Sequence, residues 1–313
     1  MTNAALLGSF GDVGGGPLVF RNKIINGGMA VDQRNAGATQ TFTAAAALAY
    51  SVDRWYGYCT GANATGARVA GTGSQFAYRF TGAASVTAIG FAQRIEQLNS
   101  YSLAGQTATL SVDLANSLLT TVTWTAYYAN TADTFGSLAS PTKTSIATGT
   151  FTVTSTVTRY QAQITVPAAA TTGIEILFTV GAQTSGTWTI QNAQLEAGSS
   201  STPFEQRLVG MELILCQRYY QLNSAVNTPL IPSGSGGNNA FGGVYLPVSV
   251  RAATSGTHNG TIYVNGVSQT FTTRTWAISL PSFSVVNIVA NGGPSVYGNS
   301  VVATLAFDVS AEL

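Results

Sequence analysis

The sequence contains few of the residues on which enzymes and metal sites depend. Its only histidine is His258, in the turn-like segment SGTHNGT, and its two cysteines, Cys59 and Cys216, lie far apart. One histidine argues against a His-based metal site or a catalytic triad, and the sequence has no Gly-x-Ser-x-Gly elbow and no P-loop. Two distant cysteines are typical of buried free thiols in a chain that folds in a reducing compartment.

Paired carboxylates are the catalytic arrangement that the composition leaves open. A glycosidase needs only two carboxylates, about 5–10 Å apart, and the chain has 12 acidic residues. No long repeat of the parallel β-helix type is visible in the sequence. We therefore expect a protein that is not an enzyme.

Four aromatic residues are the candidates for ligand binding: Tyr56, Tyr58, Tyr127 and Trp276. In the alternating segment TTVTWTAYYA, Tyr127 faces away from Trp124, so a buried Trp124 would leave Tyr127 on the outer face beside threonines. Tyr56 and Tyr58 similarly oppose Trp55. Sugar rings stack on tyrosine and tryptophan, whereas amides hydrogen-bond sugar hydroxyls. The alternative for each residue is a place in the core or in a subunit contact.

No cofactor is expected from the sequence. It contains no dense acidic loop of the EF-hand type. Asp32 or Glu196 could contribute to a structural calcium site together with backbone carbonyls, but no pattern in the sequence indicates that they do.

The composition excludes several classes of partner. Charged residues make up only 8% of the 313 residues, and the net charge is +1, so no basic surface for nucleic acid is predicted. The surface must be built from neutral polar residues, a composition that resembles surfaces that bind neutral sugars. The N-terminus lacks the features of a signal peptide, and no apolar run approaches roughly 18 residues. We expect a soluble chain that is neither exported nor inserted in a membrane.

Residues 21–205 read as an antiparallel β-sandwich. Short runs with period-2 alternation, such as Ile174, Ile176, Phe178 and Val180 on one face, are separated by Gly, Pro, Ser and Asn. No βαβ rhythm appears, so the pattern predicts an all-β fold with two sheets of four or five strands, as in a jelly roll. The Gly-rich residues 1–20 have no apolar periodicity and read as an arm that folds only against a partner.

A single helix is predicted at 206–222, in the segment QRLVGMELILCQRYYQL. Five residues at spacings of three and four form its apolar face: Leu208, Met211, Leu215, Tyr219 and Leu222. Leu213 and Ile214 widen this face, which indicates an oligomerisation helix. Residues 223–241 read as a linker loop, and residues 242–313 as a small β module with a type I′ hairpin at Asn265-Gly266.

Four segments together resemble tail-fibre and related virion appendage proteins of tailed bacteriophages: NKIINGGMAVDQRN (22–35) followed by YSVDRW (50–55), IQNAQLEAGSSSTPFEQR (190–207), ELILCQRYYQ (212–221), and VYLPVSVRAAT (244–254) with FDVSAEL (307–313). Their order and spacing also match. The resemblance implies a jelly roll similar to carbohydrate-binding modules, a connecting helix and a C-terminal β module, commonly in trimers.

The function that we expect is therefore structural. The chain would be a homotrimeric tail fibre of a phage virion, assembled in the host cytoplasm, that recognises host-surface polysaccharide through its distal C-terminal module. Residues 1–20 would dock to other virion proteins, and the helix would pack at the three-fold axis. The alternatives are a capsid decoration or head-fibre protein with the same modules, or a tail spike that cleaves glycans.

Overall fold

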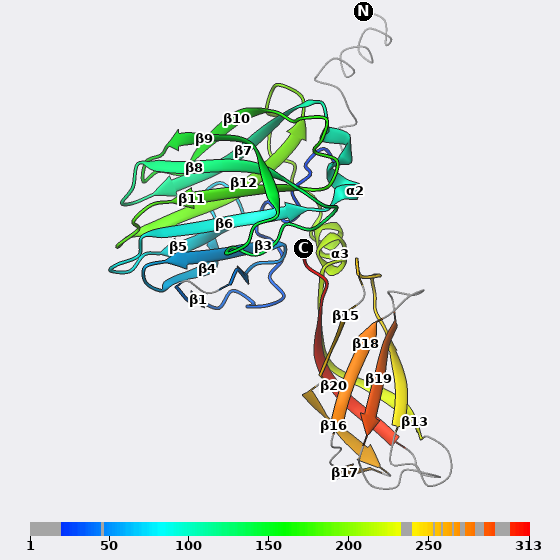
Figure 1. The fold of residues 1–313 in the computed structure, drawn as a ribbon. Coiled ribbons are helices and arrows are strands. Elements are labelled where there is room, and N and C mark those ends of the chain that lie inside the picture. The colour runs from blue at the N-terminus through cyan, green and yellow to red at the C-terminus, as the bar shows by residue number, and fades with distance from the viewer. Residues whose placement is uncertain are drawn as a thin grey trace, which may run out of the picture. The chain divides into compact units, whose positions relative to one another are not determined.

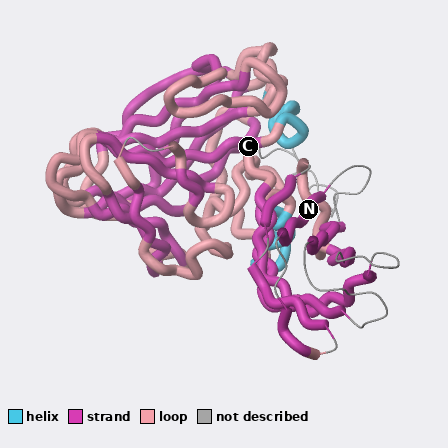
Figure 2. The backbone as a smooth tube through the Cα atoms, turned by 60° about the horizontal axis from the view of Figure 1, so that its bottom comes forward, coloured by secondary structure: helices cyan, strands magenta, loops and turns pink. Residues whose placement is uncertain are grey.

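A computed structural model describes residues 20–44, 47–232, 240–252, 254–257, 259–264, 266–269, 273–278, 285–291 and 301–313. The described residues form two compact units, one that runs to Glu212 and includes Leu313, and one from Leu213 to Glu312. Apart from Phe20, the predicted docking arm at 1–20 lies outside the described residues, as does His258. Strands dominate both units, and helices are confined to short segments (Figure 2).

The first unit is a sandwich of two six-stranded sheets (Figure 1). The first sheet has the order β1 (Gln40–Phe42), β4 (Ala64–Ala70), β5 (Phe76–Thr81), β12 (Thr187–Ala197), β7 (Thr107–Asn116), β10 (Thr158–Thr165). The second sheet has the order β2 (Ala49–Tyr50), β3 (Trp55–Thr60), β6 (Ala88–Ile95), β11 (Ile174–Val180), β8 (Thr121–Ala129), β9 (Lys143–Thr152). This confirms the predicted all-β antiparallel sandwich. Each sheet has more strands than expected because β1 and β2 are only three and two residues long.

Stacked aromatic rings form the centre of the core between the sheets. Phe91 of the second sheet stacks on Trp55, with ring centroids 4.8 Å apart, and on Tyr78 of the first sheet at 4.9 Å. Phe80 stacks on Trp188 at 5.5 Å, both in the first sheet. Because side chains alternate along a strand, burial of these rings fixes which residues face outward.

The connection from β6 to β7 contains two short helical turns, α2 (Gln97–Ser100) and η1 (Tyr101–Leu103), which the sequence pattern did not indicate. Four residues are too few to show a helical period. Leu103 is buried in the core, whereas Leu98 and Tyr101 are exposed. The connection therefore reaches the core through only one of its apolar side chains.

The predicted helix is shorter in the structure. Helix α3 spans Val209–Gln217, and strand β13 begins at Tyr220, because residues 218–220 bond to neighbouring chain instead of continuing the helix. The amide of Arg251 donates to the carbonyl of Arg218 at 2.8 Å, and the amide of Ala311 donates to that of Tyr219 at 2.7 Å.

The five residues predicted for one helical face are therefore divided. Leu208 precedes α3 and Met211 lies in it, with 80% and 40% of their surfaces exposed. Leu215 is half-buried. Tyr219, by contrast, is fully buried within the chain's own fold, and Leu222 lies in β13. Leu208, Met211 and Leu222 are exposed, but Leu222 lies on β13, so the predicted residues do not form one helical face.

The second unit is one eight-stranded antiparallel sheet. Its order is β15 (Thr254–Thr257), β18 (Thr273–Ile278), β19 (Val285–Asn291), β14 (Ala240–Tyr245), β13 (Tyr220–Pro232), β20 (Val301–Ser310), β16 (Asn259–Val264), β17 (Val267–Gln269). Residues 223–232, predicted as a linker loop, belong to β13, which pairs along its length with β20. The predicted hairpin is present: Val264 pairs with Val267, and Gly266 has a φ of 80°. Asn265 itself lies outside the described residues.

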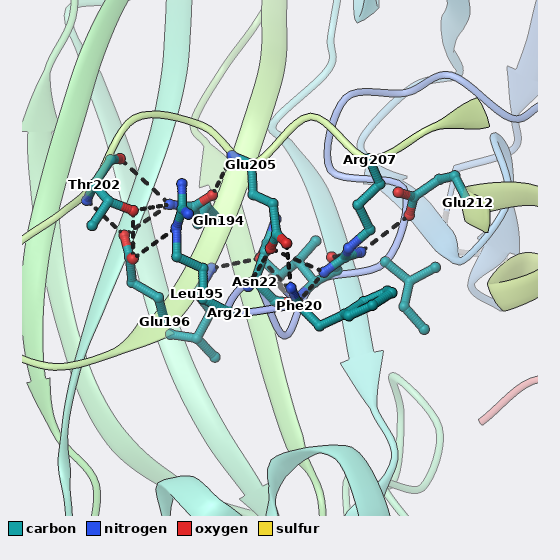
Figure 3. Close-up of polar contacts among 12 residues, drawn as sticks. Phe20, Arg21, Asn22, Gln194, Leu195, Glu196, Thr202, Glu205, Arg207 and Glu212 are labelled. Atoms are coloured by element: carbon teal, nitrogen blue, oxygen red, sulfur yellow. Dashed lines mark hydrogen bonds and ion pairs between the residues drawn. The ribbon is translucent and has the colours of Figure 1, made fainter. Parts of the chain in front are cut away.

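A buried polar cluster fastens the start of the first unit to its end (Figure 3). We call it the clasp, and it consists of Asn22, Glu205, Arg207 and Glu212. The side chain of Asn22 accepts from the amide of Leu195 at 3.0 Å and donates to the carbonyl of Ala193 at 3.1 Å. Segments 22–35 and 190–207, which carry the strongest motifs, thus meet in space.

Arg207 is the cation of the clasp. Its guanidinium lies 3.6 Å from the Glu205 carboxylate and 3.4 Å from that of Glu212, and it donates to the carbonyls of Asn22 and Ile24. Glu205 in turn accepts from the amide of Asn22 at 2.8 Å. All three charged side chains are almost fully buried, so each depends on the others for solvation.

We expect the substitution Arg207→Ala to lower the free energy of unfolding of the first unit by about 3–5 kcal/mol, because two buried carboxylates lose their cation. Urea denaturation followed by circular dichroism measures the change. Arg79→Ala is the control, since Arg79 is an exposed arginine on β5 and its loss should change stability by less than about 0.5 kcal/mol. Equal effects of the two substitutions would contradict the role of the clasp.

Candidate functional site

Three of the four predicted aromatic residues lie together on the outer face of the second sheet. Tyr56 packs there against Ala92 and Leu177, and Tyr58 and Tyr127 border the same cluster. The register explains this, because Tyr56 pairs with Ala92 and Ala92 with Leu177 across β3, β6 and β11. We call this surface the tyrosine face.

Trp276, the fourth candidate, lies on β18 of the second unit, and its side chain is outside the described residues. Within the tyrosine face, Tyr56 is only 1% exposed, so its ring is a support and offers no surface to a ligand. Its ring packs edge-on against Tyr50 at 5.9 Å. Tyr58 and Tyr127 are half-buried and keep accessible ring surface.

Tyr58 owes its position to a glycine on the neighbouring strand. A Cβ atom at Gly90 would lie 2.2 Å from Cε1 of Tyr58, so the ring occupies the space that any other residue would need. The ring therefore lies directly against the β6 backbone. A ring held in this way loses little further freedom when it binds a ligand.

A buried carboxylate organises the polar side of the tyrosine face. Glu175 on β11 is completely buried and accepts from Nε of Arg94 at 2.9 Å and from Nζ of Lys143. Each cation also lies over a ring: the guanidinium of Arg94 is 5.1 Å from the Tyr56 centroid, and Nζ of Lys143 is 4.2 Å from that of Tyr127. Cations over aromatic faces are attracted by the ring quadrupole, so Glu175 positions both rings indirectly.

Arg94 makes two further contacts at the edge of this face. Nη2 donates to the carbonyl of Gly136 at 3.0 Å and Nη1 to the carbonyl of Leu313 at 2.7 Å. The hydroxyl of Tyr50 donates to the same Leu313 oxygen at 2.8 Å. Each of the three guanidinium nitrogens of Arg94 therefore donates to a protein oxygen.

Glu175, Arg94 and Lys143 are not among the site residues predicted from the sequence. The signal was present for one of them, because Glu175 interrupts the otherwise apolar run IEILF. A charged residue at this position must face away from the core residues Ile174 and Ile176. That its partners would be Arg94 and Lys143 follows only from the strand register.

The accessible phenol of Tyr58 is protonated at neutral pH. Burial raises the pKa of Tyr58 to about 12, and the neighbouring Tyr127 and Glu175 add to the rise. Burial also raises the pKa of Tyr56 well above its ordinary value, with Glu175 contributing. Each protonated phenol can both donate and accept a hydrogen bond, which suits recognition of hydroxyl groups.

Asp32 and Glu196, the residues considered for calcium, are both engaged by protein donors. Asp32 accepts from the amides of Gly37 at 2.7 Å and Asn35 at 3.1 Å. Glu196 accepts from the amide and hydroxyl of Thr202 at 2.8 and 2.7 Å. No group of three or more His, Cys, Asp or Glu residues suited to a metal occurs in the described part of the chain.

Cys59 and Cys216 are free thiols, and both are buried. Among the described residues, no helix has the length and apolarity needed to span a membrane.

The sequence matches no protein-family model and no curated protein. Its structure is similar to solved structures at low sequence identity. One is the enzymatically active domain of a tailspike protein of bacteriophage CBA120, with 17% identity, a TM-score of 0.38, and coverage of 57% of this chain but 22% of that one. Another is the carbohydrate-binding module TmCBM61 in complex with β-1,4-galactotriose, with 12% identity, a TM-score of 0.36, and coverage of 57% and 99%.

A third is the C-terminal family 22 carbohydrate-binding module of Clostridium thermocellum Xyn10B, with 11% identity, a TM-score of 0.34, and coverage of 60% of this chain and all of that one. These likenesses concern the fold.

The raised pKa of Tyr58 predicts a distinct step in a spectrophotometric tyrosine titration. The difference between the wild type and Tyr58→Phe should be centred near pH 12, whereas an unfolded tyrosine ionises near about 10. Because the folded state holds this proton more tightly, the stability that it provides is present below about pH 10 and lost as the pH rises toward 12. Tyr58→Phe should therefore lose less stability than the wild type over that interval. A difference step near pH 10 in folded protein would show that Tyr58 is not desolvated.

Proposed function

We propose that this protein is a non-enzymatic structural component of a phage virion, a homotrimeric tail fibre whose first unit binds glycans of the host surface through the tyrosine face. One observation carries the proposal: two half-exposed tyrosine rings, Tyr58 and Tyr127, lie on a rigid sheet and flank one cluster. Such a surface provides apolar faces for sugar rings and phenol groups for sugar hydroxyls.

The hydrogen bonds of the site support a ligand that is recognised through its hydroxyl groups. Glu175 is shared by Lys143 and Arg94, and Arg94 is further bound by two carbonyl oxygens. Both cations therefore direct hydrogen bonds at groups of the protein. Recognition would therefore rest on ring stacking and on hydrogen bonds to hydroxyl groups.

The placement in a virion rests on the motifs that resemble tail-fibre proteins. Two of them, at 22–35 and 190–207, meet in the clasp, so their residues act together as one structural device. Docking through residues 1–20 and location in the virion are part of the proposal. A capsid decoration or head-fibre protein with the same modules is the second candidate, and the same motifs favour it. A map of the virion distinguishes the two candidates by showing which virion protein the arm contacts.

The trimeric state rests on the exposed apolar residues around α3. Leu208, Met211 and Ile214 recur at spacings of three and are exposed by 80%, 40% and 48%. An exposed apolar patch of this kind marks an interaction site. We propose that other copies of the chain cover this patch. The resemblance to trimeric tail fibres suggests three copies.

Replacement of Tyr58 or Tyr127 by alanine should weaken glycan binding by the full chain. Loss of a central aromatic contact costs about 2 kcal/mol, which is roughly 30-fold in Kd. Affinity electrophoresis through gels that contain soluble xylan, β-1,4-galactan or host polysaccharide measures the change as a loss of retardation.

Tyr101→Ala is the matched control, because Tyr101 is an exposed tyrosine of the same unit that lies on η1, outside the tyrosine face. Unchanged retardation of the Tyr58 and Tyr127 variants, or equal losses in all three proteins, would refute the tyrosine face as the binding site.

The oligomer is tested by Ile214→Asp. Each copy buries this side chain at the proposed interface with a gain of about 1.5–3 kcal/mol, so a charge there should dissociate the trimer into folded monomers. Light scattering coupled to size exclusion gives the mass. Leu98→Asp, at a leucine of α2 that is more exposed than Ile214, should leave the trimer intact. A monomeric wild type would exclude the proposed state.

A further inference from the structure

The first sheet carries a groove on its outer face, the side of the sandwich opposite the tyrosine face. The groove has a volume of about 430 Å³ and is lined by Asp113 of β7, Arg159 of β10, and the segment Ser201–Phe204. The groove is shallow and open to solvent, and its volume lies in the range of about 300–1,000 Å³ known for small-ligand pockets, so sugar units can lie along its surface.

The wall formed by Ser201–Phe204 is tied down to the sheet. The hydroxyl of Ser201 donates to the side chain of Gln161 on β10, and Gln163 Nε2 donates to the carbonyl of Ser199 at 2.6 Å. Thr202 is bonded to Glu196 of β12. The groove therefore has a fixed wall, as a preorganised site requires.

A β-bulge in β12 shapes the floor. The pairing of β12 with β7 shifts between Gln191 and Gln194, and Asn192 in the bulge has a φ of 51°, a left-handed conformation that is uncommon outside glycine. This conformation lets Nδ2 of Asn192 donate to Oδ2 of Asp113 at 2.7 Å. Bulges and strained residues of this kind cluster next to functional sites, where they aim a side chain.

Asp113 and Arg159 form an ion pair on the floor, with Nη1 of Arg159 3.0 Å from Oδ1 of Asp113. Arg159 also donates to the hydroxyl of Ser111 at 2.6 Å and to the carbonyl of Asn192. A guanidinium has five N–H donors, so these contacts leave two for a ligand, and 31% of the side chain is exposed. Asp113 contributes a carboxylate edge beside them, with 16% exposure.

We infer that this groove is a second saccharide-binding site, specific for neutral sugars. The pair cancels its own charge, so an anionic ligand gains little, whereas adjacent donors and acceptors match two neighbouring sugar hydroxyls. Pro203 and Phe204 provide an apolar wall for the C–H face of a ring. This inference does not depend on the tyrosine face, because the two sites lie on different sheets.

The test uses the full chain with Tyr58→Ala and Tyr127→Ala, which removes the proposed first site. Cellotriose, xylotriose, maltotriose and β-1,4-galactotriose are the neutral probes, and trigalacturonic acid is the anionic one. Saturation-transfer NMR and calorimetry measure binding. We expect at least one neutral trisaccharide to bind, and Arg159→Gln and Asp113→Asn each to weaken it about 10-fold by removing a charge-assisted hydrogen bond.

Arg79→Gln is the matched control on the outer face of the same sheet, and it should leave binding unchanged. Asp113→Asn keeps the shape of the side chain and serves if Arg159→Gln does not fold. The inference is overturned if no neutral probe binds, if only trigalacturonic acid binds, or if both groove variants bind as the control does. Binding that survives in this background but disappears with Arg159→Gln supports the groove even where the tyrosine face binds nothing.

Discussion

The position of every outward-facing residue in the first unit depends on how the core aromatic rings stack. Phe91 contacts Trp55 within its own sheet and Tyr78 across the sandwich, so it fixes the register of β3 against β6 and the pairing of the two sheets. A slip of one residue would exchange the two faces of a strand. Trp55 would then face outward and Tyr56 inward, and the tyrosine face would disappear together with the core.

The few charged residues lie where strand alternation and apolar packing alone do not hold parts of the chain together. The clasp holds together two chain segments without a shared strand, and the Glu175 cluster holds side chains of three strands. Both are almost fully buried, so each carries a desolvation penalty that only complete pairing offsets. The two networks restrict how the joined segments can be arranged, because a network of paired charges tolerates fewer arrangements than an apolar contact does.

The sequence predicted the sandwich well because period-2 alternation reports directly on which side of a strand is buried. It also placed Tyr127 opposite Trp124 correctly, for the same reason. The end of α3 could not be predicted from the apolar pattern, since Tyr219 and Leu222 continue the helical spacing. The chain leaves the helix because Tyr220 pairs with Ser310 of β20. The same holds for residues 223–232, whose Asn, Thr and Pro suggest a loop until β20 provides a partner.

The binding sites themselves were only partly predictable, and the reason is physical. A tyrosine can be assigned to a face from its neighbours in sequence, but its exposure depends on what covers it, so Tyr56 and Tyr58 could not be distinguished. Gly90 seats the Tyr58 ring, and its importance is visible only once β6 lies beside β3. The groove is even harder to predict from the sequence, since Asp113, Arg159 and Phe204 come from three segments that the bulge at Asn192 brings together.

The scarcity of charge gives this surface its chemical character. In the described part of the first unit, six acidic residues pair with cations of the same unit: Asp32, Asp113, Glu175, Glu196, Glu205 and Glu212. Charges paired in this way project little field into solvent, and because only 8% of the residues are charged, much of the surface is hydroxyl, amide and aromatic. Such a surface cannot steer a ligand from a distance, and its contacts are insensitive to salt. In the proposed virion role this independence would be useful, because many weak neutral contacts, repeated in each copy of the proposed trimer, add up without any one of them being strong.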